Sequence, residues 1–153
     1  MTANSAHHSV EWLGTSYRIL LHAEQTGSRI GVFESLVQPG YGPPRHIHSR
    51  EDETFHILSG EVEFWADGRM RSEGPGSVVF VPRGSEHTFR VLGDLPARML
   101  TIVTPGGFEG FFAEMAGRGC RIPEDMDEIA TVGARFNLTF TGPPLGVVEE
   151  SSR

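Results

Sequence analysis

Four residues in two short segments have the types and the spacing of a metal site. His46 and His48 lie two positions apart, so on an extended chain both imidazole rings point to the same face. Glu53 follows after a short polar turn, and His87 follows the turn Pro82–Gly84 in the second segment. Three imidazoles and one carboxylate suit Fe, Mn, Co, Ni, Cu or Zn rather than Ca or Mg. Four protein ligands leave one or two positions open on such an ion, as Lewis-acid catalysis or O2 activation requires.

The residues around these segments predict the strands that must position the four side chains. From Glu11 to about Thr104, short runs rich in Val, Ile, Phe and Leu are broken by Gly, Pro and Asp-Gly. The expected strands are Tyr17–His22, Ile30–Val37, Thr54–Leu58, Glu61–Ala66, Met70–Ser72, Val78–Val81, Thr88–Val91 and Met99–Val103. Their spacing predicts an all-β antiparallel sandwich or barrel.

The pattern changes from strands to helices after Pro105. Apolar residues there recur at helical spacing, namely Phe108, Phe111, Phe112 and Met115. Pro123 begins a second helical segment, with acidic residues in its first turn. We therefore predict one domain, with a flexible N-terminus over residues 1–10, a β-barrel over 11–104, a helical cover over 105–146 and a polar tail over 147–153.

Composition excludes several classes of function. The 153 residues include 13 basic residues, all of them arginine, so Schiff-base catalysis and a P-loop lysine are excluded. The single cysteine, Cys120, excludes an intrachain disulfide framework and a cysteine-rich metal site. A net charge of −7 gives no general attraction to nucleic acids or anionic membranes.

The same observations set expectations about location and partners. The first residues lack the layout of a signal peptide and no apolar run approaches a membrane span, so we expect a cytoplasmic protein. We expect a small-molecule substrate, no nucleic-acid partner and no membrane partner. Exposed strand edges favour a homodimer formed by pairing of β-sheets.

The two segments resemble the two conserved motifs of the cupin superfamily. The first motif reads Gly, five residues, His-x-His, three or four residues, Glu, six residues, Gly, and the matching residues are Gly40, His46, His48, Glu53 and Gly60. The second reads Gly, five residues, Pro-x-Gly, two residues, His, three residues, Asn, and the matching residues are Gly76, Pro82, Gly84 and His87. Val91 stands where the family has asparagine, which is not a metal ligand, so the predicted site is unaffected.

This resemblance implies a small antiparallel cupin β-barrel, or jelly roll, with a short helical C-terminal extension. The four motif residues would converge inside the barrel on one divalent transition-metal ion, which could be Fe, Ni, Co, Mn, Cu or Zn. Phe55 shares a strand face with Glu53, whereas Phe89 and Val91 share one with His87. We expect these three side chains to line the substrate pocket beside the metal.

A narrower resemblance is to the single-cupin relatives of quercetin 2,3-dioxygenase. It is carried by the Pro-Gly-Gly-Phe-Glu segment at 105–109 and by two helices that end near Pro143. The resemblance implies a metal-dependent dioxygenase that opens the ring of a flavonol, or a similar enolisable aromatic compound, with O2. Glu53 would be the catalytic base, with a pKa near neutrality if burial and metal offset each other.

Two other functions remain open on the sequence. The first is another metal-dependent cupin enzyme, such as an isomerase or a dioxygenase of small diketones, which a small cavity would favour. The second is a non-enzymatic protein that binds small ligands. His56 alternates away from Glu53 and is expected on the opposite face of its strand, while Cys120 has no sequence context that would activate a thiol. The helix with Phe108 at its start packs on the barrel or acts as a lid over its mouth.

Overall fold

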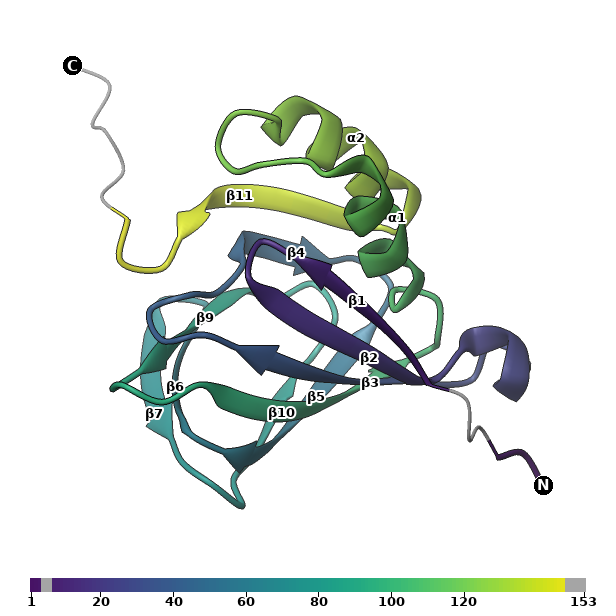
Figure 1. The fold of residues 1–153 in the computed structure, drawn as a ribbon, viewed down its shortest axis with the longest axis horizontal. Helices are drawn as coiled ribbons and strands as arrows, with labels where there is room; N and C mark the ends of the chain where they lie inside the picture. Colours follow the sequence, from purple (N-terminus) through teal and green to yellow (C-terminus); the bar gives the residue numbers. More distant parts are fainter. Residues whose placement is uncertain (4–6, 148–153) are drawn as a thin grey trace.

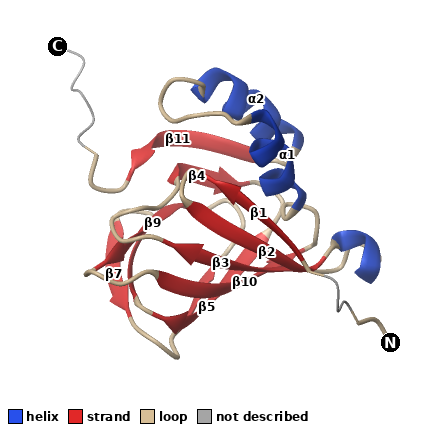
Figure 2. Ribbon diagram, in the orientation of Figure 1, coloured by secondary structure: helices blue, strands red, loops and turns tan. Residues whose placement is uncertain are grey.

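Two antiparallel β-sheets make up most of the protein (Figure 1, Figure 2). The structure, a computed structural model, describes residues 1–3 and 7–147. Across the first sheet the strands are β1 (His8–Trp12), β2 (Thr15–Leu21), β3 (Gly31–Val37), β10 (Ala97–Thr104), β5 (Asp52–Ser59) and β8 (Val78–Val81). Across the second sheet they are β11 (Leu138–Pro144), β4 (Pro44–His48), β9 (Glu86–Leu92), β6 (Glu61–Ala66) and β7 (Arg69–Glu73). The predicted all-β fold is confirmed, in the form of a jelly roll of two sheets.

Alternation of buried and exposed residues aims the candidate ligands at the interior. Along β5, Glu53, Phe55 and Ile57 are buried, whereas the residues between them are only partly buried. His56 is one of the latter, so the prediction that it points away from Glu53 is confirmed. Along β4 the same period buries His46 and His48.

The apolar core has two parts. One lies between the sheets and contains Val37, Phe55, Ile57, Val62, Phe64, Val81, Val91, Ala97 and Met99. The other lies beneath two helices, α1 (Gly110–Arg118) and α2 (Met126–Arg135), which sit together on one side of the sheets (Figure 2). Neither helix of the described chain has the length and apolar composition needed to span a membrane.

The predicted helical cover over 105–146 is wrong in its last part. Residues 138–144 form strand β11, which pairs with β4 so that Leu138 lies opposite His48 and Phe140 opposite His46 (Figure 1). Asn137 has a left-handed backbone, with φ of 59°, and turns the chain from α2 into this strand. The local sequence, with Gly142 and two prolines, has low strand propensity, so pairing with a distant strand determines its structure.

The N-terminal part also contains more structure than the sequence predicts. Residues 1–10 were expected to be flexible, but β1 begins at His8 and pairs with β2. The indole N–H of Trp12 donates a hydrogen bond of 2.8 Å to the Cys120 carbonyl, which ties β1 to the segment after α1. Residues 4–6, and all but the first residue of the expected tail over 147–153, lie outside the described residues.

A buried carboxylate joins the helical cover to the first sheet. Glu109, which is 2% exposed, accepts hydrogen bonds from the backbone N–H groups of Ala23, at 2.5 Å, and Gly107, at 2.7 Å. Gly31 lies directly against it, because a Cβ atom added there would be 2.1 Å from Oε2 of Glu109. The close approach of β3 to this carboxylate therefore requires glycine at position 31.

Candidate metal centre

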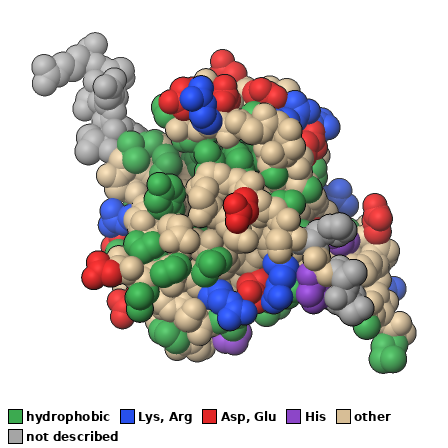
Figure 3. All heavy atoms as spheres, in the orientation of Figure 1, with side chains coloured by type: hydrophobic (Ala, Val, Ile, Leu, Met, Phe, Trp, Pro, Cys, Tyr) green, Lys and Arg blue, Asp and Glu red, His purple; other side chains and the backbone are tan. Residues whose placement is uncertain are grey.

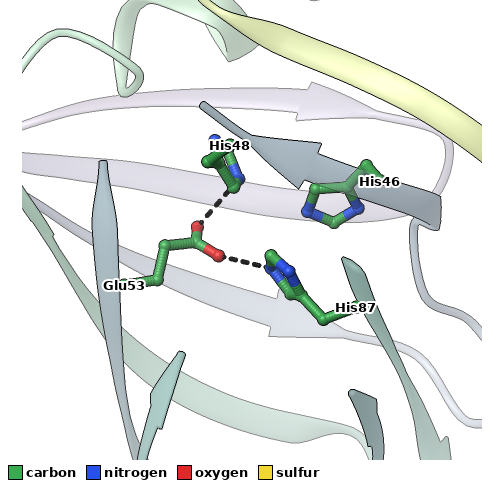
Figure 4. Close-up of side chains that lie close together, drawn as sticks. All are labelled: His46, His48, Glu53 and His87. Carbon is green, nitrogen blue, oxygen red and sulfur yellow. Dashed lines mark hydrogen bonds and ion pairs between the residues drawn. The ribbon is translucent and has the colours of Figure 1, made fainter. Parts of the chain in front are cut away.

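Four side chains from three strands point toward one another in the space between the sheets (Figure 4). His46 and His48 come from β4, His87 comes from the adjacent strand β9, and Glu53 comes from β5 of the opposite sheet. In the register of the second sheet, His46 is directly opposite His87. One nitrogen or oxygen atom of each residue lies within 4.8 Å of the others, and all four residues are buried. The structure thus brings together all four ligands predicted from the sequence.

Backbone carbonyl groups determine which ring nitrogen of His46 and of His87 carries the proton and which can bind a metal ion. Nδ1 of His46 is 2.8 Å from the Pro44 carbonyl oxygen, and Nδ1 of His87 is 2.9 Å from that of Ser85. Because a carbonyl oxygen only accepts hydrogen bonds, each Nδ1 must carry the proton and donate it. Nε2 of each ring is therefore available to bind a metal ion, an arrangement that commonly orients metal-binding histidines.

The carboxylate of Glu53 connects the two sheets at the site. Its Oε2 atom is 2.7 Å from Nε2 of His87, and its Oε1 atom is 3.3 Å from Nε2 of His48. Burial raises the pKa of Glu53, but the charge and contact of His48 and the hydrogen bond and charge of His87 hold that pKa well below its usual value. This direction favours an ionised carboxylate at neutral pH, and the near-neutral pKa expected for Glu53 beside a metal ion stays a prediction.

The surroundings of His46 and His87 shift the pKa values of these two histidines in opposite directions. Burial and the nearby charges of His87 and His48 hold the pKa of His46 well below 6.5, which keeps its imidazole neutral. Burial also lowers the pKa of His87, but the hydrogen bond and the charge of Glu53 outweigh burial and raise it. A neutral imidazole is the form that binds a metal ion.

His48 supplies a test of whether the site fits a metal ion. Its ring is almost fully buried, and neither Nδ1 nor Nε2 makes a hydrogen bond, although Nε2 lies 3.3 Å from Oε1 of Glu53. A buried polar atom without a partner costs about 1–3 kcal/mol, and metal coordination by Nε2 would remove that cost. Together with the oxygen and nitrogen donors around it, this ring fits a divalent transition-metal ion held by His46, His48, Glu53 and His87.

A fifth buried residue, Glu51, was missed by the sequence analysis. It lies in the turn between β4 and β5, is 3% exposed, and has an Oε2 atom without a hydrogen-bond partner. That atom is 3.8 Å from Nδ1 of His48. Burial raises the pKa of Glu51 in spite of the nearby His48 charge. The segment Arg50–Glu53 reads as a solvated polar turn, so its sequence does not distinguish buried Glu51 from its exposed neighbour Arg50.

An aromatic cavity of about 290 Å³ adjoins the cluster and is lined by His46 and Glu53 at that end. Its volume is near the lower limit of small-molecule sites, about 300 Å³. The aromatic side chains that line it are Trp12, Tyr17, Phe33, Tyr41, Phe55, Phe89, Phe108, Phe111, Phe112 and Phe140. Phe55 and Phe89 thus lie where the sequence predicted, whereas Val91 is packed in the core between the sheets and does not line the cavity.

The helical cover forms one wall of this cavity. The ring of Phe108, just before α1, meets the ring of His48 edge-on with 4.3 Å between centroids. Phe112 stacks on Tyr17 of β2 at 3.8 Å between centroids. In Figure 3, hydrophobic side chains lie between the helices, which carry many charged side chains, and the sheets beneath them. The cover therefore contributes lining residues; its movement as a lid remains a prediction.

The fold and the four clustered side chains match what the resemblance to the cupin superfamily implies. Residues 33–103 match the family described as the cupin domain, and this range contains every residue of the cluster.

The proteins to which the chain is similar differ in the function that their names give. It is 31% identical over 96 residues to a quercetin 2,3-dioxygenase of Bacillus subtilis (strain 168), a match covering 63% of this chain and 28% of that protein. It is 26% identical over 93 residues to the tetracenomycin polyketide synthase protein TcmJ of Streptomyces glaucescens, covering 60% of this chain and 62% of that one. The chain thus spans less than two-thirds of the length of either relative.

A solved structure, KdgF from Halomonas sp., superposes with a TM-score of 0.59 at 18% identity. The superposition covers 70% of this chain and 94% of that one. At this level of identity, the likeness shows the fold alone.

Proposed function

We propose that this protein is a metal-dependent dioxygenase that opens the ring of a flavonol or a similar enolisable aromatic compound. The observation that carries the proposal is the buried cluster of three histidines and one glutamate at the end of a cavity whose lining includes ten aromatic side chains. The similarity to a quercetin 2,3-dioxygenase supports the same reaction class. O2 is the proposed second substrate.

The residues of the chain have distinct roles in this proposal. His46, His48, Glu53 and His87 would hold a divalent transition ion, which supplies Lewis acidity toward a substrate oxygen and access to O2 chemistry. The aromatic walls would hold the flat rings of the substrate and exclude water from the reacting centre. Glu53 lines the cavity as an ionised carboxylate, so it would accept the proton of the flavonol 3-hydroxyl group.

The overall reaction balances without an added reductant. The two carbon–carbon bonds to the hydroxyl-bearing carbon break, and that carbon leaves with its oxygen as carbon monoxide. Both atoms of O2 enter the ring-opened product, and the proton accepted by Glu53 returns to that product. The substrate supplies the electrons that reduce O2.

The lining of the cavity favours this reaction over the two alternatives. The cavity volume of about 290 Å³ favours the small substrate of an isomerase or a diketone dioxygenase, but such a substrate would leave most of the aromatic wall unused. A protein that only binds ligands has no need of four clustered metal ligands beside the ligand cavity. We therefore rank both alternatives below the flavonol-type dioxygenase.

Elemental analysis of purified protein, followed by oxygen uptake with quercetin, tests the proposal. We expect one metal ion per chain, together with oxygen consumption and carbon monoxide release. His48→Ala should lose the metal and the activity, whereas His56→Ala, on the outer face of β5, should keep both. Wild-type protein that takes up no metal after reconstitution, or that binds metal but consumes no O2 with any flavonol, would contradict the proposal.

We also propose that two copies of the chain form a homodimer through the outer face of the first sheet. Strand β8 is at the edge of that sheet, where Val78 and Phe80 are 61% and 60% exposed beside the 39% exposed Leu58 of β5. An exposed apolar face on an edge strand is typical of an interface. Light scattering should give twice the chain mass, and Phe80→Glu should give monomers; a monomeric wild type would exclude this dimer.

A further inference from the structure

Inside the aromatic cavity, the first sheet presents a line of hydroxyl groups that the proposed reaction does not use. Thr15 and Tyr17 come from β2, Ser35 comes from β3 and Thr101 comes from β10, and all four residues line the cavity. We call these four residues the hydroxyl track. Ser35 and Thr101 are almost fully buried, with 3% and 1% of their surface exposed.

The strand register places the hydroxyl track in a row that leads away from the candidate metal centre. On β10, Val103 is opposite Glu53, and Thr101 is the next inward-facing residue, opposite Phe55. Ser35 is one further inward step away, because it pairs with Met99 on one side and Tyr17 on the other. Since two residues of a strand span about 6.7 Å, Ser35 lies roughly 13 Å along the sheet from the level of Glu53.

Two members of the track have no partner within the protein. The neighbouring Thr15 side chain lowers the pKa of Tyr17, but burial outweighs it and raises that pKa to about 12, so Tyr17 keeps its proton. In residues 1–3 and 7–147, no hydrogen bond involves the hydroxyl group of Ser35 or Thr101. A buried hydroxyl group is costly unless it is paired, and Ser35 and Thr101 both line the aromatic cavity.

We propose that the hydroxyl track binds oxygen substituents on the part of an aromatic substrate that lies farthest from the metal centre. The substrate class is then a planar aromatic compound with phenolic hydroxyl or carbonyl groups at both ends. Each hydroxyl group of the track can donate to a carbonyl and accept from a phenol, so both substituents suit it. This inference rests on the proposed function for the orientation of the substrate, with its reacting oxygen toward Glu53.

The chemistry of the track sets the selectivity that the protein should show. The aromatic walls bind any flat ring of suitable size, so they do not distinguish a hydroxylated ring from a bare one. Two buried hydroxyl groups left unpaired by a bare ring would penalise that ligand by roughly ten- to a hundredfold in affinity. The track therefore supplies selectivity, and the metal centre supplies reactivity.

A pair of probes that differ only in their outer hydroxyl groups tests this inference. Quercetin carries hydroxyl groups on both outer ring systems, whereas 3-hydroxyflavone has only the reacting hydroxyl. Dissociation constants are measured by fluorescence for Co²⁺-loaded protein under nitrogen, so that no turnover occurs. The variants are Thr101→Val and Ser35→Ala, which remove one hydroxyl group each, with Thr54→Val, on the outer face of β5, as the matched control.

We expect wild-type protein to bind quercetin roughly ten- to a hundredfold more tightly than 3-hydroxyflavone. Each track variant should weaken quercetin binding several-fold and leave 3-hydroxyflavone binding unchanged, and Thr54→Val should change neither. Equal affinity for the two probes, or a preference that survives both substitutions, would overturn the hydroxyl track. Thermal unfolding of each variant confirms that it is folded.

Oxygen uptake measured in parallel separates this inference from the proposed dioxygenase. A preference for quercetin that depends on the track, without oxygen uptake, would retain the track and overturn the dioxygenase. Oxygen uptake with both probes, without any preference in binding, would retain the dioxygenase and overturn the hydroxyl track. Failure of the loaded protein to bind either probe would overturn both.

Discussion

At the scale of single residues, the candidate metal centre depends on groups outside the four motif positions. The Pro44 and Ser85 carbonyl groups set the protonation of His46 and His87, but no backbone carbonyl does the same for His48. The buried carboxylate of Glu51 lies 3.8 Å from Nδ1 of His48. We infer that a small movement on metal binding brings these two groups into hydrogen-bond contact, because each otherwise remains unpaired.

Replacing Glu51 with glutamine tests this role. The amide keeps the volume but removes the negative charge that raises the basicity of His48, so we expect metal affinity to fall about ten- to a hundredfold. Competition with a chelator of known affinity measures the change. Glu61→Gln, an exposed position on β6, serves as the control and should leave metal affinity unchanged. Unchanged metal affinity in Glu51→Gln would show that Glu51 has no role in metal binding.

The ligand positions could be predicted from sequence because they follow local rules. A two-residue spacing on a strand determines that His46 and His48 share a face, and the turn containing Pro82 and Gly84 precedes His87. Burial of Glu51 obeys no local rule, since it results from how the turn after β4 packs in three dimensions. The same holds for Val91, which shares a strand face with the pocket residue Phe89 but packs in the core between the sheets.

At the scale of elements, close approaches and charge pairs between strands hold the first sheet together. Gly31→Ala would place a Cβ atom 2.1 Å from Oε2 of Glu109 and 2.9 Å from Cγ2 of Val103. Two backbone N–H groups donate hydrogen bonds to Glu109, and its carboxylate cannot move without breaking those hydrogen bonds. We expect a loss of about 1–3 kcal/mol in the free energy of unfolding, measured with denaturant.

The matched control for this substitution is Gly74→Ala. An added Cβ atom at position 74 meets nothing within 4 Å. The free energy of unfolding should therefore change little at that position. Equal effects at the two glycines would show that the contact with Glu109 is unimportant.

A second contact between strands predicts a dependence of stability on pH. Glu34 of β3 is paired with Arg18 of β2, at 3.2 Å, and with Arg98 of β10, at 2.9 Å. Partial burial raises the pKa of Glu34, but the hydrogen bond from Arg98 and the charges of both arginines lower it overall. A lowered folded-state pKa contributes stability above the unfolded value, about 4.3, which is lost as the pH falls through the folded-state pKa.

Glu34→Gln should therefore destabilise the protein at pH 7 and have little effect in acid. The expected loss at neutral pH is at most about 1 kcal/mol, because both arginines are largely exposed. Thermal unfolding across this pH range measures it, with the exposed Glu24→Gln as control. A loss that stays constant with pH would show that charge is not its cause.

Strand β11 was missed by the sequence analysis because a distant strand holds it. Strand β11 contains Gly142, Pro143 and Pro144, whose local preferences oppose a strand, yet it pairs along β4 from Pro44 to His48. Helix α1 could be predicted, because Phe111, Phe112 and Met115 give a helical period that its packing confirms. Local periodicity thus predicts an element such as α1, whose own apolar residues form its buried face. It does not predict an element such as β11, whose structure depends on pairing with a strand far away in sequence.

At the scale of the whole molecule, the four candidate ligands join the two sheets. Three of them lie on strands of the second sheet and Glu53 lies on the first. A bound ion would therefore connect the sheets across the core. Because the folded chain binds the ion and the unfolded chain lacks the assembled site, binding stabilises the fold by mass action.

Thermal unfolding should show this coupling directly. We expect added metal at a hundred times its dissociation constant to stabilise the protein by about 2.7 kcal/mol, seen as a higher Tm. Removal of the ion with a chelator should reverse the shift, and His48→Ala should show none. A wild-type Tm that does not respond to metal would contradict a site that spans both sheets.

The position of β4 has a consequence for how the protein is made. This strand carries His46 and His48, and it pairs with β9 at only two positions but with β11 along its whole length. During synthesis, β11 follows His48 by about ninety residues, so the strand with two candidate ligands is made well before its main partner. The complete site therefore requires β11 to be paired with β4, and we expect the folded chain, rather than the nascent peptide, to bind the ion.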